Sequence, residues 1–157
     1  MKIELWQIGK SADKWLLQGI AEYEQRLKRY NPFEIVTLPE VKGGHRLSSE
    51  QLMEKEAELV LSRLQPGDFF VLLDENGQGY TSRKFARQLE QWLQYSAKRI
   101  IFVVAGAWGA APVLKLRANA LVSLSPMTFS HQMVRLFFVE QLYRAFTIMR
   151  GQPYHND

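Results

Sequence analysis

Continuous apolar runs constrain the fold of this chain more than any other feature of its sequence. Residues 69–73 and residues 100–104 are entirely apolar, and a third, shorter apolar strand is expected at residues 120–124. Runs without alternation are typical of strands covered on both faces, as in a parallel sheet. Segments with helical spacing lie between them. We therefore expect an α/β domain with a mostly parallel sheet and helices on both faces.

The remaining segments alternate between strand and helix in the same way. Residues 2–8 and 33–38 alternate as strands, and Ser48 with Gln51 predicts a capping box that opens a helix reaching residue 64. Further helices are expected after Thr81 or Ser82, at residues 112–117 and at residues 131–149. The first helix, capped by Ser11 or Asp13, should present an apolar face of Trp15, Leu16, Ile20, Tyr23, Leu27 and Tyr30. With 157 residues, 46% of them hydrophobic, the chain fits one domain spanning residues 1–157.

Composition excludes several classes of site. The chain has no cysteine, which rules out disulfides, thiolate metal ligands and a cysteine nucleophile, and its three histidines lack the spacing of a metal site. No stretch approaches the roughly 20 apolar residues of a membrane span, and the start lacks a signal-peptide pattern, so we expect a cytoplasmic protein. The net charge of +4 suits a polyanionic partner but also a basic enzyme of any kind. From residue 115 onward, five basic residues stand against two acidic ones, which suits RNA phosphate, with a solvated helix face as an equal alternative.

Three loops are candidates for ligand binding. In open parallel sheets ligands bind beyond the carboxyl ends of the strands, which points to the loops after Leu73, Val104 and Leu124. The loop at residues 105–109 carries small residues that let a ligand approach the backbone closely, although a plain glycine turn would look the same. Because the G-x-G-x-x-G pattern is absent, a nicotinamide dinucleotide is disfavoured.

The last quarter of the chain holds a long helix that is apolar nearly all round. Such a helix must be covered on most sides, either as a core helix or in a dimer interface. Ser130 is expected to be its N-cap rather than a nucleophile. Arg144 either pairs with Glu140 one turn earlier or serves a functional site, and the tail with Tyr154 and His155 is either frayed or in contact with a nucleic-acid base.

Several of these segments together carry a family resemblance. They are residues 70–74, Ala105-Gly106 with Gly109, Met127-Thr128-Phe129 followed by His131-Gln132-Met133-Val134-Arg135, Glu140-Gln141-Leu142-Tyr143-Arg144, the Lys42-Gly43-Gly44 loop and the ending Pro153-Tyr154-His155. The chain resembles the ribosomal RNA large subunit methyltransferase H family over its whole length. The resemblance implies the SPOUT class, in which the C-terminal chain forms a trefoil knot that binds S-adenosylmethionine and a homodimer completes each site.

The resemblance also implies a reaction and its residues. The family methylates N3 of pseudouridine 1915 in 23S rRNA of the assembled ribosome. Matching positions imply a cofactor site of Leu73, Gly106, Ser125, Pro126, Met127, Thr128, Phe129 and Ser130, RNA contacts from His131 and Arg135, and catalytic roles for Arg144, Tyr154 and His155. Lys42 and Arg46 in the basic glycine loop are candidates for a second RNA contact, although such charges are more often solvated. Arg144 would stabilise the developing anion on the ring, and His155 would relay the proton.

Two positions depart from the family pattern, and two other functions stay open. Ala105 stands where the family usually has glycine, and Asn156 stands where it usually has a basic residue, which puts a phosphate contact at that position in doubt. A knotted methyltransferase acting on transfer RNA or on another rRNA site would use the same cofactor residues. A nonenzymatic ribosome-binding module would keep the fold, with the two departures as early signs of decay.

Overall fold

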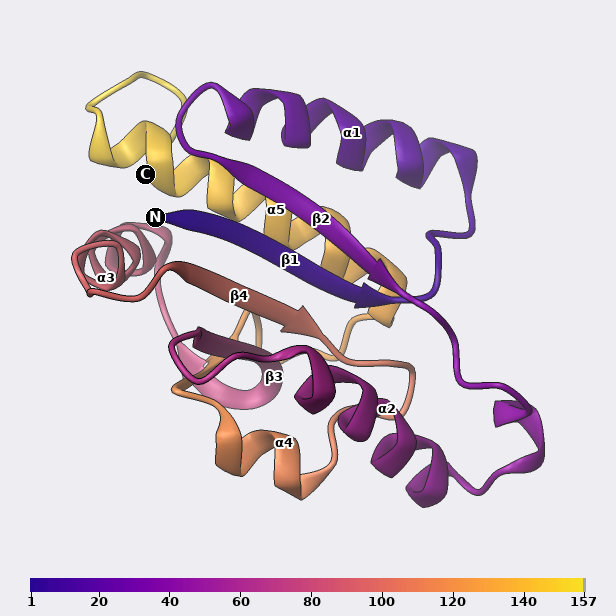
Figure 1. The fold of residues 1–157 in the computed structure, drawn as a ribbon. Helices are drawn as coiled ribbons and strands as arrows, with labels where there is room; N and C mark the ends of the chain where they lie inside the picture. Colours follow the sequence, from indigo (N-terminus) through magenta and orange to yellow (C-terminus); the bar gives the residue numbers. More distant parts are fainter. Residues whose placement is uncertain (157) are drawn as a thin grey trace.

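The computed structural model describes residues 1–156, and its strands form one parallel sheet. The strands are β1 (Lys2–Ile8), β2 (Phe33–Leu38), β3 (Phe69–Gly79), β4 (Arg99–Val104) and β5 (Ala120–Ser123). Their order across the sheet is β2-β1-β4-β3-β5, and every pair is parallel. The two fully apolar runs occupy the centre and are buried, which confirms the predicted parallel sheet (Figure 1).

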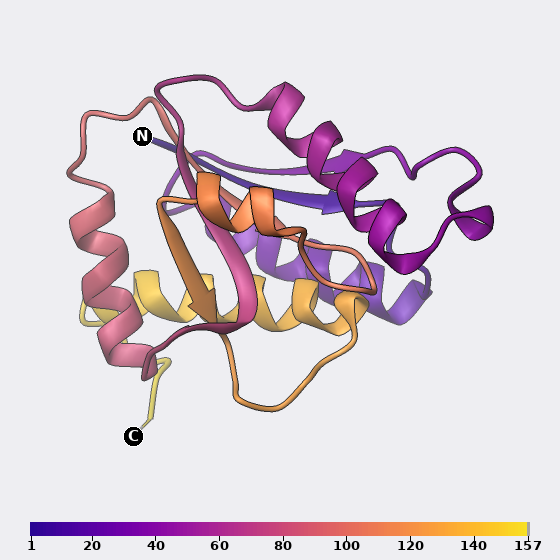
Figure 2. The same cartoon turned by 90° about the horizontal axis from the view of Figure 1, so that it is seen from below.

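Helices cover both faces of the sheet, as predicted. One face carries α1 (Lys14–Lys28), α3 (Ser82–Trp92) and α5 (His131–Met149), and the other carries α2 (Ser49–Arg63) and α4 (Pro112–Arg117) (Figures 1 and 2). A short 3-10 helix, η1 (Gly44–Arg46), precedes α2. Each face has its own hydrophobic core, and none of the described helices is long and apolar enough to cross a membrane.

The helix starts confirm most of the predicted caps. Ser48 and Gln51 form both hydrogen bonds of the capping box, Thr81 caps α3, and Ser130 Oγ accepts from the Met133 backbone N–H at 3.2 Å to cap α5. Asp13 stands at the N-cap of α1 without a side-chain hydrogen bond. Trp15, predicted on the apolar face of α1, is 57% exposed, because the buried side of this helix is formed by Leu16, Ile20 and Leu27.

Strand β3 continues beyond the predicted strand end at Leu73. The register with β5 shifts between Leu73 and Gln78, after which Gln78 and Gly79 pair again with Val122 and Ser123. The predicted loop at residues 75–80 is therefore mostly strand, bent by an irregularity that leaves the residues after Leu73 out of the ladder. A Cβ at Gly77 would lie 2.7 Å from the Leu121 carbonyl carbon, so this close approach requires glycine.

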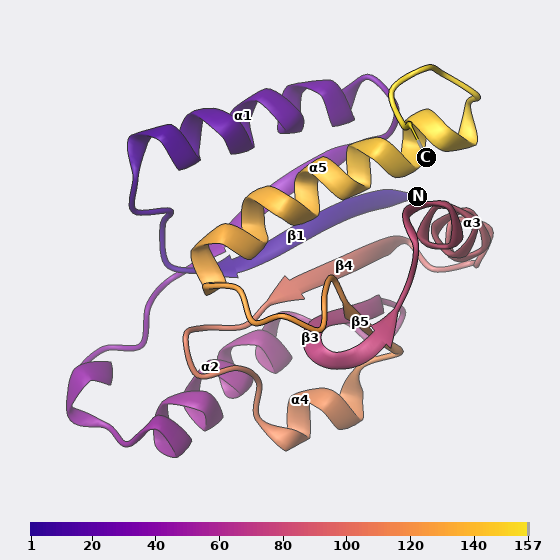
Figure 3. The ribbon, with the colours of Figure 1, turned by 180° about the vertical axis from the view of Figure 1, so that it is seen from behind.

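Helix α5 lies along the sheet between α1 and α3 and runs opposite to the strands (Figure 3). It begins beside the carboxyl ends of the central strands, and the segment at residues 124–130 leads to it from the edge strand β5. This arrangement brings the first turn of α5 to the edge of the sheet where ligands of parallel sheets bind.

Candidate functional site

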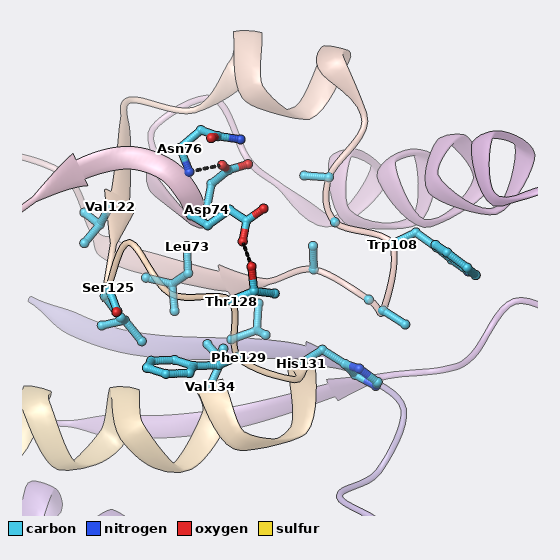
Figure 4. A pocket seen from close by; sticks show the side chains of 18 of the residues that line it. Leu73, Asp74, Asn76, Trp108, Val122, Ser125, Thr128, Phe129, His131 and Val134 are labelled. Atoms are coloured by element: carbon cyan, nitrogen blue, oxygen red, sulfur yellow. Dashed lines mark hydrogen bonds between the residues drawn. The ribbon is translucent and has the colours of Figure 1, made fainter.

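The three predicted ligand loops lie side by side and enclose a cavity of about 300 Å³ at the carboxyl edge of the sheet. The loops follow β3, β4 and β5, and the first turn of α5 closes the remaining side (Figure 4). The volume falls in the range of small-molecule sites. The prediction that these loops meet at one edge is therefore confirmed.

The walls of the cavity are apolar where the strands end and are formed by backbone along the β4 loop. Leu73, Val104 and Val122 come from three neighbouring strands, and Phe129 faces them from the loop before α5 (Figure 4). Residues 106–109 form a tight turn in which the Gly109 N–H donates to the Gly106 carbonyl at 3.0 Å, with a φ of 88° at Gly109. The small residues of this turn leave backbone groups open to a ligand.

The polar groups of the cavity gather after β3. Asp74 accepts from the Asn76 N–H at 2.8 Å and faces Lys115 of α4 at 3.4 Å. The Thr128 hydroxyl donates to Glu75 at 2.7 Å, which joins the β3 loop to the loop before α5 (Figure 4). Lys115 also lines the cavity and offsets the charge of Asp74, which leaves Glu75 as the carboxylate without an opposite charge, and apolar walls with one such carboxylate suit a ligand that is partly apolar and carries positive charge.

Most predicted cofactor residues line this cavity, and two do not. Those that line it are Leu73, Gly106, Ser125, Met127, Thr128 and Phe129. Pro126 is exposed outside the lining, and Ser130 is engaged as the cap of α5. The sequence did not single out Asp74, Glu75 and Val122 as site residues, although Asp74 and Glu75 stand in the loop that the strand-end rule had selected.

His131 lies at the mouth of the cavity, at the start of α5 (Figure 4). Burial, reinforced by the charge of Arg135, lowers the pKa of its imidazole, and Glu40 opposes this only in part. The ring is therefore neutral at pH 7. An RNA contact through His131 would rest on a hydrogen bond or on stacking rather than on a charge.

Arg135, predicted to contact RNA, is buried inside the protein. Its side chain is 1% exposed and donates to the backbone carbonyls of Ile8 at 2.7 Å and Gly9 at 3.0 Å, and to Ser11 Oγ at 3.3 Å. A guanidinium that is buried and bonded in this way holds the start of α5 against the end of β1 and has no route to RNA in this conformation. Its assignment to RNA is corrected accordingly: Arg135 is an anchor of the fold.

Lys42 and Arg46 lie on the loop around η1, away from the lining of the cavity. Both are exposed, and Gly43 between them takes a φ of 68°. This left-handed conformation suits glycine and turns the loop outward before α2 begins. The loop offers two positive charges to solvent on the helix α2 side of the molecule.

The three predicted catalytic residues lie together at the other end of α5. Arg144 donates to Glu140 Oε1 at 2.5 Å and lies 3.0 Å from His155 Nδ1. Its guanidinium is 4.9 Å from the centre of the Tyr154 ring, and Tyr154 donates to the same Glu140 oxygen at 3.0 Å. We call these four side chains, Glu140, Arg144, Tyr154 and His155, the Arg144 cluster. The pair one helical turn apart, which the sequence left as an alternative, exists within it.

Electrostatics keep the Tyr154 hydroxyl of this cluster protonated. Burial raises its pKa, and the bonds to Tyr23 and Glu140 raise it further. The tail is thus bonded to α5 rather than frayed. At about 1.5 Å of rise per residue, Arg144 stands about 20 Å along α5 from His131 at the cavity. One chain therefore keeps its cavity and its Arg144 cluster at opposite ends of a helix.

The described residues contain no group of three or more histidine, cysteine, aspartate or glutamate side chains that could hold a metal ion.

In comparisons with known proteins, the model of the family described as "Predicted SPOUT methyltransferase" matches residues 1–155. Proteins named "Ribosomal RNA large subunit methyltransferase H" are similar over their full length. The one from Parabacteroides distasonis is 47% identical, with 100% of both chains covered, and the one from Cytophaga hutchinsonii is 46% identical, covering 99% of this chain and 100% of its own.

A solved structure described as that of a probable methylase family protein from Haemophilus influenzae shares the fold. The TM-score is 0.52 at 13% sequence identity, and the match covers 95% of this chain and 66% of the other. At this identity the likeness concerns the arrangement of helices and strands alone.

Proposed function

The chain belongs to the SPOUT methyltransferase family, and from this premise we propose that it transfers a methyl group from S-adenosylmethionine to N3 of pseudouridine 1915 in 23S rRNA of the assembled ribosome. The observation that carries the proposal is the cavity in which three strand-end loops meet. It lies in a chain that matches, over its full length, relatives named as rRNA methyltransferases. We further propose that residues 1–157 act as one domain in the cytoplasm, where that substrate is found.

The residues of the cavity fit S-adenosylmethionine. Its adenosine part is apolar and flat, which suits the walls at Leu73, Val122 and Phe129, and the backbone of Gly106 and its neighbours is open to its polar edges. The positive charge of its sulfonium centre suits a cavity bordered by Asp74 and Glu75. When bound, the cofactor supplies an activated methyl group.

The protein's own contribution is to align the acceptor and to help N3 lose its proton. The pKa of that nitrogen lies well above neutrality, so a positive group near the ring oxygens would favour the deprotonated form. Arg144 is suited to this because Glu140, Tyr154 and His155 hold its guanidinium in one orientation. His155 accepts from Arg144 through Nδ1, the one nitrogen of the neutral ring that can accept a proton, so it would take the proton from N3 there once this bond is released, and pass it to solvent.

A complete site needs a second copy of the chain in this proposal. The cavity and the Arg144 cluster of one chain lie about 20 Å apart along α5, too far to act on one methyl group. In a homodimer, the tail of one subunit would meet the cavity of its partner. Exposed apolar side chains beside the cavity, Met127 at 74% and Phe137 at 39%, support a protein contact there.

The trefoil knot belongs to the same proposal. The segment at residues 124–130 leads from the edge strand β5 past β3 to the start of α5, which covers one face of the sheet, and the tucked C-terminal chain of the family would follow such a path (Figures 2 and 3). On the RNA side, we propose contacts from His131 at the cavity mouth and from Lys42 and Arg46, whose charges are open to phosphate.

The test is methyl transfer from labelled S-adenosylmethionine to intact ribosomes and to free rRNA, followed by mapping of the labelled nucleotide. We expect label on ribosomes at N3 of pseudouridine 1915. Label on another nucleotide or on transfer RNA would replace the substrate and keep the enzyme class. Binding to ribosomes without methyl transfer or cofactor binding would identify a nonenzymatic module.

A further inference from the structure

Glu56, in the middle of α2, is a buried carboxylate without a partner. It is 9% exposed and shares the inner face of the helix with Ala57 and Val60. No hydrogen bond or ion pair joins its side chain to any residue in the described range 1–156. Among the described residues, the fully buried side-chain atoms without a partner belong to Gln7, Arg135 and Arg144, so the Glu56 oxygens keep some contact with solvent, although burial of most of the side chain still disfavours their charge. This side chain therefore calls for an explanation beyond the fold.

Its carboxylate lies directly against the turn that forms one wall of the cavity. A Cβ built on Gly106 would be 2.5 Å from Glu56 Oε2 and 2.7 Å from Oε1, so glycine is required for the two to fit as they do. Met53, one helical turn earlier on the same face of α2, lines the cavity itself. Glu56 thus stands behind Gly106, with a single glycine backbone between its carboxylate and the space open to a ligand.

No neighbouring charge balances this carboxylate. Burial alone raises its pKa, with no contribution from another charged group. The β4 loop at residues 105–111 contains no titratable side chain. On α4, Lys115 is engaged by Asp74, and on α2 itself Lys55 pairs with Glu58 toward solvent. The nearest opportunity for compensation is therefore a positive charge inside the cavity.

We propose that Glu56 makes the cavity selective for a cationic ligand: its ionised carboxylate, acting across Gly106, favours the sulfonium of the methyl donor over the uncharged sulfur of the demethylated product. This inference rests on the proposed function, because it takes S-adenosylmethionine as the ligand. Arrival of the cation stabilises the ionised form, so a carboxyl that is protonated beforehand releases its proton to solvent. After transfer the sulfur is neutral, and the product loses this attraction.

Calorimetry on the purified full-length protein tests the inference without any turnover. S-adenosylmethionine and S-adenosylhomocysteine are each titrated into the wild type and into Glu56→Gln, in two buffers of different ionisation enthalpy across pH 5 to 8, because burial raises the pKa of the Glu56 carboxyl above its ordinary value. Glu58→Gln, a change at an exposed position of the same helix, is the matched control. In the wild type we expect proton release with the donor and none with the product.

In Glu56→Gln we expect the affinity ratio of donor to product to fall about tenfold, with product affinity retained, because one charge interaction of this kind is commonly that large. Unchanged proton release and an unchanged ratio in a variant that still binds the product would overturn the inference and leave the proposed function intact. Failure of the wild type to bind the donor at all would overturn the proposed function. If Glu56→Gln does not fold, Glu56→Ala takes its place, and a ratio of donor to product affinity unchanged from the wild type overturns the inference.

Discussion

The two ends of helix α5 are built in opposite ways. At its first turn the loops leave a cavity whose walls are small residues, strand ends and open backbone. At its last turns the side chains are already bonded to one another, with Glu140 accepting from both Arg144 and Tyr154. The first end is open to receive a ligand, whereas the second holds its groups in a fixed geometry.

This difference suggests a division of labour that experiments can separate. The cavity should lose affinity for its ligand when a side chain is added beside its open backbone groups. The Arg144 cluster should lose turnover when one of its side chains is removed, with ligand affinity unchanged. The helix between them is rigid and is anchored at its first turns through Arg135. A change at one end should therefore leave the other end intact.

The largest effect is expected from Arg144→Ala. Removing the one positive group proposed to face the developing anion should lower turnover on ribosomes by about 10²–10³-fold, the usual loss for such a donor. Affinity for S-adenosylmethionine, measured by calorimetry, should stay within about twofold, because Arg144 is proposed to act on the acceptor ring and not on the cofactor. Arg150→Ala removes an exposed arginine of the same region and serves as the control. Normal turnover in Arg144→Ala would break the division described above.

Arg135→Met should produce the next largest effect, on stability. The substitution leaves the Ile8 and Gly9 carbonyls without their buried donors, and we expect the free energy of unfolding to fall by about 3 kcal/mol in urea titrations. Arg46→Met, at an exposed position, should stay within about 0.5 kcal/mol of the wild type. Equal stability of the two variants would show that α5 needs no such anchor.

Much of the fold could be predicted because its determinants are local. Apolar runs identified the central strands, and Ser48, Thr81 and Ser130 identified three helix starts from a side chain and its neighbour three residues on. The extension of β3 to Gly79 escaped prediction, because its pairing with β5 resumes only after an irregularity. Such pairing depends on a segment more than 40 residues away, and no pattern within residues 74–79 announces it.

For the site, too, local features could be predicted and contacts between distant parts of the chain could not. Strand ends pointed to the loops after Leu73, Val104 and Leu124, and these do enclose the cavity. The roles given to Arg144 and His155 came from family resemblance, since no spacing rule joins a helix to a tail. The RNA role of Arg135 was wrong because the carbonyls that bind it belong to residues 8 and 9, at the other end of the chain. Glu56 was missed because its carboxylate lies against Gly106, which is also distant in the chain.

Gly106→Ala tests the receiving end alone. The new methyl group would fall within 3 Å of the Glu56 carboxylate, so the turn or the glutamate must move. We expect cofactor affinity to fall about tenfold by calorimetry, because a shift of this size misaligns the backbone groups that face the ligand. Gly67→Ala, where a Cβ would meet nothing within 4 Å, is the control. Unchanged affinity in Gly106→Ala would mean that the flexible end of the Glu56 side chain moves aside and the turn keeps its place.

The smallest effect is expected from Lys42→Ala and Arg46→Ala, which lie outside both ends of α5. If these exposed side chains contact phosphate, each change should weaken ribosome binding by about two- to threefold at moderate salt and reduce the slope of log affinity against log salt by about one. Cofactor affinity and turnover at saturating ribosome concentration should not change, because neither residue lines the cavity. The control is Lys55→Ala, which removes an exposed lysine on α2. Binding assays at several salt concentrations would then separate a specific contact from a general effect of charge. Equal slopes of log affinity against log salt in the three variants would mean that the loop is a solvated basic surface without a specific RNA contact.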